Sequence, residues 1–293
     1  MMLYEILENH EDFTEIEQSI STYVLHHPNE LEISSARSIA KNLFVSASAV
    51  TRFTQKLGYE GYNDFRRAFL EEDKYLHSHF QNIDPNRPFL SNDSDYQISG
   101  KISTLFAETV ADTQSLINYE TLEHCASIMS RARIIYVFSA GSQLQLGQIF
   151  SEKMAMIGKQ VITSPYMDVA FNLAANAKAD ECFLLVSYSG ETRSVLKTAN
   201  KLKAMNHPFI SLTSYGQNTL SILSTHILYL STREHMNSGI GNYGSYISAM
   251  YLFDVLYSCI FKKNYKENLS IKYQNAKEFQ DERRTTNPIL KDE

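Results

Sequence analysis

Apolar residues recur every three or four positions in the first quarter of the chain, and this spacing predicts three helices. The first spans about 14–26 and ends before Pro28, whose ring cannot continue a helix. The second starts after a serine cap at position 34 or 35, and the third runs from a cap at Ser46 to a stop at Gly58. Two short helices joined by a tight turn form a helix-turn-helix, whose second helix enters the major groove of DNA.

The exposed face of that last helix carries side chains suited to reading base pairs. Arg52 and Gln55 can each form paired hydrogen bonds with base edges, and the shorter Ser48 and Thr51 lie on the same face. The residues expected to hold DNA phosphates are Arg37, Lys41, Ser46 and Lys56. Spacing alone equally allows a dimerisation bundle with a solvated basic rim. Phe44 counts against DNA binding, because the turn usually favours a residue that tolerates a positive φ.

From about residue 100 to Lys263, short β-rich runs alternate with helical patterns, which is typical of a parallel sheet covered by helices. Five strands are expected, at 133–138, 160–163, 182–186, 208–212 and 226–230. The predicted fold is an all-α helix-turn-helix domain followed by an α/β domain with a doubly wound, five-stranded parallel sheet. The expected boundaries are 1–75 for the first domain, 76–100 for a linker with prolines and small polar residues, 101–270 for the second domain and 271–293 for a polar tail.

Two turns rich in serine and glycine follow the first and third predicted strands. They read Ser139-Ala140-Gly141-Ser142 and Ser187-Tyr188-Ser189-Gly190-Glu191-Thr192. Ligands of doubly wound sheets lie outside the carboxyl ends of the strands, where unpaired amides at helix starts favour an anion. The hydroxyls of Ser187, Ser189 and Thr192 add donors, and Gly190 would let the backbone approach a ligand closely. These neutral donors suit a phosphate ester. The simpler alternative is that the second turn only caps a helix.

An enzyme that isomerises a phosphosugar is the main functional alternative, and such an enzyme needs a general base and a general acid. The titratable candidates are Glu191, Glu234, His235 and His207. Glu191 is expected to complement the dipole of the helix that it opens, and none of the four makes catalysis necessary. We therefore predict a protein that is not an enzyme. No nucleotide-binding glycine motif occurs and the three cysteines are widely spaced, so neither a cofactor nor a metal is expected.

Composition and charge narrow the class of protein. Hydrophobic residues make up 43% of the 293 residues and charged residues 20%, as in an ordinary folded soluble chain. The start of the chain has no signal-peptide pattern and no membrane span is expected, which predicts a cytoplasmic protein. The formal net charge of −6 falls in residues 1–75, which hold 7 basic and 13 acidic side chains. Within them, residues 34–67 hold 6 basic and 2 acidic side chains, a local excess that suits DNA.

The helix-turn-helix segment resembles the DNA-binding domain of RpiR-type transcriptional regulators. The matching strings are Ile39-Ala40-Lys41-Asn42-Leu43-Phe44-Val45-Ser46, Val50-Thr51-Arg52-Phe53 and Lys56-Leu57-Gly58-Tyr59-Glu60-Gly61-Tyr62. Phe44 departs from the family pattern at the turn, and Ala49 stands where a hydroxyl residue is common. The resemblance implies operator DNA as a partner and a homodimer or a dimer of dimers.

The second domain resembles the sugar isomerase (SIS) domain, which usually follows the DNA-binding domain in RpiR-type regulators. By this resemblance, hydroxyls of Ser187, Ser189 and Thr192 would hold a phosphate together with the amides of Tyr188 and Gly190. Further contacts with the ligand are implied at Ser139, Gly141, Ser142 and Glu234. The implied function is a DNA-binding regulator of sugar or amino-sugar metabolism whose operator binding is modulated by a phosphosugar effector.

Overall fold

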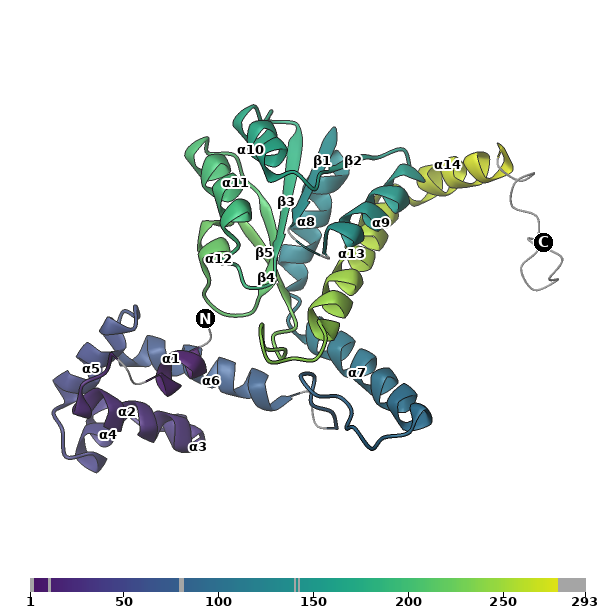
Figure 1. The fold of residues 1–293 in the computed structure, drawn as a ribbon. Coiled ribbons are helices and arrows are strands. Elements are labelled where there is room, and N and C mark those ends of the chain that lie inside the picture. Colours follow the sequence, from purple (N-terminus) through teal and green to yellow (C-terminus); the bar gives the residue numbers. More distant parts are fainter. Residues whose placement is uncertain (1–2, 10–11, 79–81, 140, 142, 279–293) are drawn as a thin grey trace. The chain divides into compact units, whose positions relative to one another are not determined.

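The protein, seen in a computed structural model, is described over residues 3–9, 12–78, 82–139, 141 and 143–278. It divides into two compact units (Figure 1). The head unit comprises Met1–Asp84, Pro88–Thr104 and Tyr215–Gln217, and the sheet unit comprises Pro85–Arg87, Leu105–Ser214 and Asn218–Glu293. Each unit has a buried apolar core of its own.

Helices make up the head unit. They are α1 (Leu3–Glu8), α2 (Glu15–His26), α3 (Pro28–Leu31), α4 (Ala36–Asn42), α5 (Ala47–Lys56), α6 (Tyr62–Ser78) and the start of α7 (Asp95–Ser115). The side-chain oxygens of Ser35 and Ser46 accept hydrogen bonds from backbone N–H groups in the first turns of α4 and α5, each over 3.2 Å. Because such caps satisfy amides that have no partner within the helix, both helices begin where their serines predict.

The head core is built from the apolar faces of these helices. Its buried side chains are Leu3, Leu7, Ile20, Val24, Leu31, Ile39, Ala40, Val50, Phe53, Tyr62, Phe65 and Phe69. Helices α4 and α5 contribute Ile39, Ala40, Val50 and Phe53 to this core, whereas Leu43 and Leu57 lie at its margin and are half-buried. The sequence analysis did not predict α1 or α6, which supply five of these twelve side chains, including Leu7 and Phe65.

Phe44 occupies the turn between α4 and α5. Its φ is 56°, in the left-handed region, and its side chain is 96% exposed. The N–H of Val45 donates to the carbonyl of Ala40 over 2.9 Å and closes the turn. A left-handed conformation costs a residue with a β-carbon about 1–2 kcal/mol. The turn therefore has the geometry that a helix-turn-helix needs. Because the Phe44 side chain is exposed, no burial of apolar surface offsets the cost of this conformation.

The sheet unit contains the five predicted strands. They are β1 (Ile134–Ser139), β2 (Gln160–Thr163), β3 (Glu181–Ser187), β4 (Ile210–Ser214) and β5 (His226–Leu230). All neighbouring pairs are parallel, and the order across the sheet is β2-β1-β3-β4-β5. This order confirms the doubly wound parallel sheet. It reverses direction between β1 and β3, so the carboxyl ends of these two adjacent strands flank the switch point.

Helices cover both faces of this sheet (Figure 1). They are α8 (Tyr119–Arg131), α9 (Gln143–Ala155), α10 (Met167–Ala175), α11 (Arg193–Ala204), α12 (Thr219–Leu223), α13 (Tyr243–Lys263) and α14 (Tyr265–Glu278). One core lies between the sheet and α8, α9 and α13, and another lies between the sheet and α10, α11 and α12. Strands β1 and β3 are buried along their whole length, as expected for central parallel strands.

Several element boundaries differ from the expected domain boundaries. Helix α6 continues to Ser78 and α7 begins at Asp95, so both ends of the expected linker 76–100 are helical. Helix α14 includes residues 271–278 of the expected polar tail, and the remainder of the tail lies outside the described residues. Among the described helices, α13 alone is long and apolar enough to cross a membrane by length and composition. Half of its apolar window is buried, and its side chains form part of the sheet-unit core.

Candidate DNA-binding face and ligand cavity

Helix α5 has one apolar and one polar side. Val50 and Phe53 are buried in the head core, whereas Ser48, Arg52 and Gln55 are exposed. Because residues three and four positions apart lie on the same side of a helix, the three exposed side chains form one polar face. Three of the four side chains that the sequence predicts to face base pairs therefore lie together on this surface.

The other residues predicted to contact DNA differ in how available their side chains are. Arg37 and Lys41 are exposed on α4. Ser46 is exposed, but its hydroxyl oxygen already caps α5. Thr51 is half-buried, and its hydroxyl donates to a backbone carbonyl one turn earlier over 3.2 Å. A phosphate is therefore reached more easily from Arg37 and Lys41 than from the two hydroxyl groups.

Lys56 already has partners within the head unit. Its Nζ lies 2.9 Å from a carboxylate oxygen of Glu17 and 2.9 Å from the backbone carbonyl oxygen of Asp12. It also lies 5.5 Å from the centroid of the Phe13 ring. These contacts join α5 to the start of α2 and to the residues before it. A phosphate contact by Lys56 would have to displace them, so the geometry favours Arg52 over Lys56 as a DNA-binding residue.

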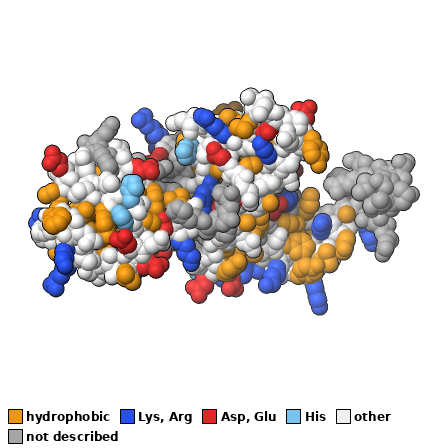
Figure 2. Space-filling view, turned by 90° about the horizontal axis from the view of Figure 1, so that it is seen from below, with side chains coloured by type: hydrophobic (Ala, Val, Ile, Leu, Met, Phe, Trp, Pro, Cys, Tyr) orange, Lys and Arg blue, Asp and Glu red, His pale blue; other side chains and the backbone are white. Residues whose placement is uncertain are grey.

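Charge on the surface is mixed in sign. Basic and acidic side chains both occur over the face of the molecule seen in Figure 2. This agrees with the net charge of −6 for the whole chain. Attraction to a DNA duplex must therefore come from a few local cations, of which Arg37, Lys41 and Arg52 are exposed on α4 and α5.

A cavity of about 240 Å³ opens beside the carboxyl ends of β1 and β3, at the switch point of the sheet. Its lining residues are Gly141, Gln143, Ser187, Tyr188, Ser189, Thr192, Glu234, His235, Met236, Asn242 and Ser245. Six of the nine predicted ligand residues are among them, namely Gly141, Ser187, Tyr188, Ser189, Thr192 and Glu234. The volume lies just below the range for ligand pockets, about 300–1,000 Å³, and suits a small polar molecule.

Hydroxyl groups converge on this cavity from the turn after β3. The side-chain oxygens of Ser187 and Thr192 are 2.8 Å apart and share one hydrogen bond. Since each hydroxyl carries one proton, this pair keeps one O–H to donate to a ligand. Ser189 accepts a hydrogen bond from the N–H of Glu191 over 3.1 Å, which leaves its own proton available as well. Two O–H groups, one from the Ser187–Thr192 pair and one from Ser189, can therefore donate to an anion.

The turn after β1 contributes less to the described cavity. Ser139 is 3% exposed and does not line the cavity, and its hydroxyl oxygen has no hydrogen-bond partner among the described residues. Gly141 does line it, with a φ of 71°. Ser142 lies outside the described residues. Gln143, the first residue of α9, reaches the cavity although the sequence analysis did not include it.

Gly190 and Glu191 have roles that differ from those expected. Gly190 has a φ of 69°, and a β-carbon there would lie 2.0 Å from the side-chain oxygen of Asn218. Glycine is therefore required by the packing of Asn218, and Gly190 is not among the lining residues. The carboxylate of Glu191 accepts hydrogen bonds from the N–H and the hydroxyl of Thr219, both over 2.8 Å. It therefore holds the start of α12, and the expectation that it complements α11 is wrong.

Glu234 places a buried carboxylate in the cavity wall. The residue is 7% exposed, and its Oε2 accepts a hydrogen bond from the N–H of Ser245 at the start of α13 over 3.1 Å. Its Oε1 is buried and has no partner among the described residues. Burial raises the pKa of Glu234, and backbone N–H groups of Ser245, Tyr243 and Gly244 offset part of the rise. A ligand hydroxyl or N–H that reached Oε1 would supply the missing hydrogen bond.

The four candidate acids and bases of an isomerase are not assembled at one place. Glu234 and His235 line the cavity, but Glu191 is engaged with Thr219. His207 lies among residues at the amino ends of the strands, beside Glu181. Burial lowers the pKa of His207 at that opposite edge of the sheet. Of the four candidates, Glu234 and His235 line the polar cavity, whereas Glu191 and His207 lie elsewhere.

The sequence analysis missed most of the cavity wall that follows β5. Met236, Asn242 and Ser245 line the cavity, and His235 appeared only as a candidate acid or base. These residues lie in an irregular loop and at the start of α13. Such a loop has no hydrophobic period, so its sequence carries no signal for the direction of its side chains.

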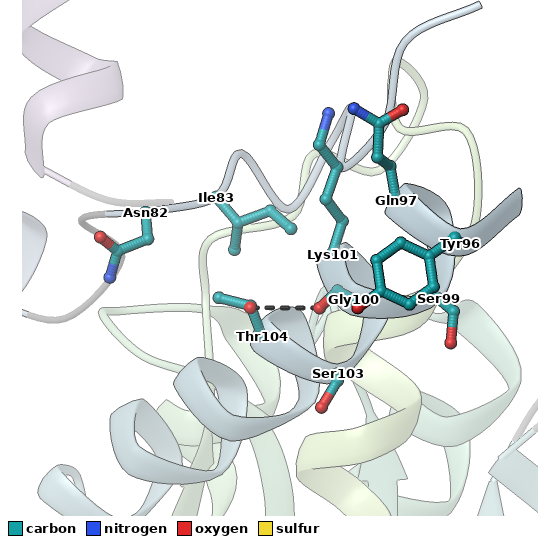
Figure 3. Close-up of a pocket in the computed structure, with 9 residues that line it drawn as sticks. All are labelled: Asn82, Ile83, Tyr96, Gln97, Ser99, Gly100, Lys101, Ser103 and Thr104. Carbon is teal, nitrogen blue, oxygen red and sulfur yellow. Dashed lines mark hydrogen bonds between the residues drawn. The ribbon is translucent and has the colours of Figure 1, made fainter. Parts of the chain in front are cut away.

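A wider hollow of about 470 Å³ lies in the head unit at the start of α7 (Figure 3). Its lining residues are Asn82, Ile83, Tyr96, Gln97, Ser99, Gly100, Lys101, Ser103 and Thr104. The Nζ of Lys101 lies 2.6 Å from a carboxylate oxygen of Asp93, and the hydroxyl of Thr104 donates to the carbonyl of Gly100 over 3.2 Å. None of the predicted ligand residues borders this hollow. The cavity of the sheet unit is therefore the better candidate for a ligand site.

Comparison with known proteins places both units in one family. The model of the rpiR-family helix-turn-helix domain matches residues 1–75, and the model of the SIS domain matches residues 128–259. The chain belongs to the RpiR family of transcriptional regulators. An uncharacterised HTH-type transcriptional regulator of Bacillus subtilis, YbbH, is 25% identical to this RpiR-type chain over 254 residues, which cover 85% of the chain and 87% of YbbH.

Two solved structures share the fold of this RpiR-type protein. The NanR protein of Vibrio vulnificus, solved in complex with ManNAc-6P, is 24% identical with a TM-score of 0.62, over 97% of this chain and all of that one. The sugar isomerase domain of an RpiR transcription factor from Sphaerobacter thermophilus is 17% identical with a TM-score of 0.54, over 62% of this chain and 99% of that one. Membership of the family decides between the two functional interpretations. The protein is a DNA-binding transcriptional regulator with a SIS domain and is not an isomerase.

Proposed function

We propose that this RpiR-type regulator binds a phosphosugar in the cavity beside β1 and β3, and that binding changes its affinity for operator DNA. The hydroxyls of Ser187, Ser189 and Thr192 hold the phosphate, and Glu234 accepts a hydrogen bond from the sugar. One observation carries the proposal: free hydroxyl protons and a buried carboxylate oxygen without a partner line the same small cavity. Ser142 and the backbone of Tyr188 complete the proposed site, with Ser139 and Gly190 behind it.

An amino-sugar phosphate is the first candidate for the effector. NanR, which shares the fold over both units, was solved with ManNAc-6P. The Oε1 atom of Glu234 needs a donor, and an N-acylated amino sugar offers an amide N–H as well as hydroxyls. Regulation of amino-sugar metabolism follows from this choice of effector.

The operator contacts that we propose lie on α4 and α5. Arg52 and Gln55 contact bases, with Ser48 and Thr51 beside them, and Arg37, Lys41 and Ser46 contact phosphates. Lys56 supports α5 through Glu17 and contributes to DNA binding mainly by holding that helix in place.

A homodimer is the proposed assembly, because two half-sites on DNA require two recognition helices. Exposed apolar side chains on α9 and α13, which pack side by side, support an interface there. They are Ile149 on α9 and Tyr246 on α13, 44% and 38% exposed, and Met156 directly after α9 is 38% exposed as well. Two such dimers can pair further into a dimer of dimers. We place the protein in the cytoplasm, because a bacterial-type transcription factor binds its operator DNA there.

Calorimetric titration of the full chain with ManNAc-6P tests the effector proposal. Ser187→Ala removes one member of the hydroxyl pair and should weaken binding about tenfold, the effect of about one lost hydrogen bond to a charged group. Ser258→Ala is the matched control, because this exposed hydroxyl on α13 bonds only to its own helix. Equal affinity of the two variants would place the phosphate elsewhere. ManNAc without phosphate should bind far more weakly than ManNAc-6P.

A further inference from the structure

The chain segment Pro85–Arg87 belongs to the sheet unit, although the residues before and after it belong to the head unit. Asn86 is the residue that attaches it. Its side-chain N–H donates to the carbonyl of Arg233 over 3.1 Å, and its side-chain oxygen accepts from the N–H of His235 over 2.7 Å. Its backbone carbonyl accepts from the N–H of Ile240 over 3.1 Å. Three hydrogen bonds thus fix this segment to the loop that follows β5.

The side chain of Asn86 holds the backbone on both sides of the cavity residue Glu234. It bonds to Arg233 and His235, which come directly before and after Glu234 in the chain. The backbone carbonyl of Glu234 itself accepts a hydrogen bond from the hydroxyl of Tyr188 over 2.9 Å. A peptide held at both flanking residues moves together with the group that holds it. The position of the Glu234 carboxylate is therefore linked to the position of Asn86.

The same loop is also tied to helix α7, which runs from the head unit into the sheet unit. The guanidinium of Arg233 lies 3.2 Å from a carboxylate oxygen of Asp112, with both side chains buried. Removing one partner of a buried ion pair is strongly destabilising, so this contact is a fixed anchor. Asn86 is half-buried and uncharged, and its side-chain bonds can break at lower cost.

We infer that Asn86 transmits effector binding from the cavity to the segment that joins the two units. The inference rests on the proposed function. A ligand that bonds to Oε1 of Glu234 favours one position of the loop after β5, and Asn86 follows that position. The segment between the units then favours one arrangement, and the affinity for operator DNA changes with it. Asn86 is a positioning residue: it couples the two ligands and contributes little to the binding of either one.

The test measures coupling separately from binding. Asn86→Ala removes the two side-chain hydrogen bonds and leaves the backbone one. Asn92→Ala is the matched control, with the same substitution at an exposed position of the head unit just before α7. The operator affinity of the full chain is measured with and without saturating ManNAc-6P on a duplex selected from a random pool by the wild type. The affinity for ManNAc-6P is measured by calorimetry.

Wild type and Asn92→Ala should show a change in operator affinity on adding ManNAc-6P of about 5- to 150-fold, the usual range of allosteric coupling. In Asn86→Ala this ratio should fall to within about twofold of one, while each affinity measured alone changes less than about threefold. Asn86→Asp keeps the acceptor for His235 and loses the donor to Arg233, so it should show an intermediate ratio.

Two results would overturn the inference. Asn86→Ala could keep the wild-type ratio, or it could lose ManNAc-6P affinity outright, which would make Asn86 part of the binding site. Hydrogen exchange gives a second readout that does not need the operator. On adding ManNAc-6P, protection should change in both the loop after β5 and the segment around Asn86 in the wild type, but only in the loop in Asn86→Ala. Failure of the proposed function is distinguishable, because wild type itself would then show no response.

Discussion

Glu234 has one carboxylate oxygen in a structural role and one for which the described residues provide no partner. Oε2 accepts a hydrogen bond at the start of α13, where the helix dipole favours a negative charge. Oε1 is buried and lacks a partner among the described residues, and such an atom costs about 1–3 kcal/mol. Capping α13 requires only one oxygen, so a purely structural role does not explain why a second oxygen is buried without a hydrogen bond. The arrangement is what a ligand-binding carboxylate requires before its ligand arrives.

Glu234→Gln should stabilise the ligand-free protein at neutral pH, because it removes a buried negative charge and keeps an oxygen that can accept from the N–H of Ser245. Because burial raises the pKa of Glu234, the folded wild type binds a proton more tightly than the unfolded chain. Its stability relative to the glutamine variant then falls as pH rises from the ordinary glutamate pKa through the raised value. The difference between the two proteins should be largest at neutral pH and vanish in acid, as measured by calorimetric unfolding.

Glu191→Gln controls for the substitution itself, since Glu191 is exposed and both its carboxylate oxygens are hydrogen-bonded to Thr219. A glutamine at 191 that stabilised the protein as much as one at 234 would contradict the explanation from burial. Calorimetry with ManNAc-6P should also show weaker binding by Glu234→Gln, because an amide N–H can replace the acceptor that the sugar needs.

At the scale of elements, support of α5 and the proposed contact with DNA fall to different cations of the helix. Arg52 projects from the exposed face, while Lys56, one turn later, is paired with Glu17. The two cations carry the same charge and lie on the same helix. Their different surroundings predict different effects of the same substitution.

Arg52→Ala should weaken operator binding by about 1–3 kcal/mol, roughly 5- to 150-fold, through the loss of a bidentate base contact. Lys56→Ala should weaken it less and leave the salt dependence of binding unchanged, since its charge is neutralised within the head unit. Fluorescence anisotropy at several salt concentrations measures both quantities. A salt slope reduced by about one in Lys56→Ala would show that Lys56 contacts a phosphate after all.

At the scale of the whole molecule, the proposed function requires assembly as well as the two units. An operator with two half-sites requires two chains, and exposed apolar side chains on α9 and α13 offer a surface for a second copy. Ile149 is 44% exposed on α9. Burial of such side chains against a partner removes apolar area from water and favours association.

Ile149→Glu should convert a dimer to a monomer, as measured by light scattering after size exclusion, and should weaken operator binding. The control is Ile222→Glu, which places the same charge on an isoleucine that is 67% exposed on α12, across the sheet. A monomeric wild type, or dimers of both variants, would move the proposed interface away from α9.

The sequence by itself determined the elements and their chemistry. Serine caps at Ser35 and Ser46 and the apolar period marked α4 and α5, and apolar runs marked the five strands, because these signals depend on neighbours along the chain. The residue strings also carried the family resemblance. Even the conflict at Phe44 was visible, since the turn geometry demands a positive φ whatever residue occupies it.

Tertiary structure decided which of these residues meet. The strand order makes β1 and β3 neighbours and so brings the turns that follow them to one edge of the sheet. Tertiary packing places Asn218 so close to residue 190 that only glycine fits there, and it places Glu17 beside Lys56. Asn86 bonds to His235 across 149 positions of the chain. No periodic pattern marks such a contact, because two single polar groups become partners only after the sheet has placed their loops together.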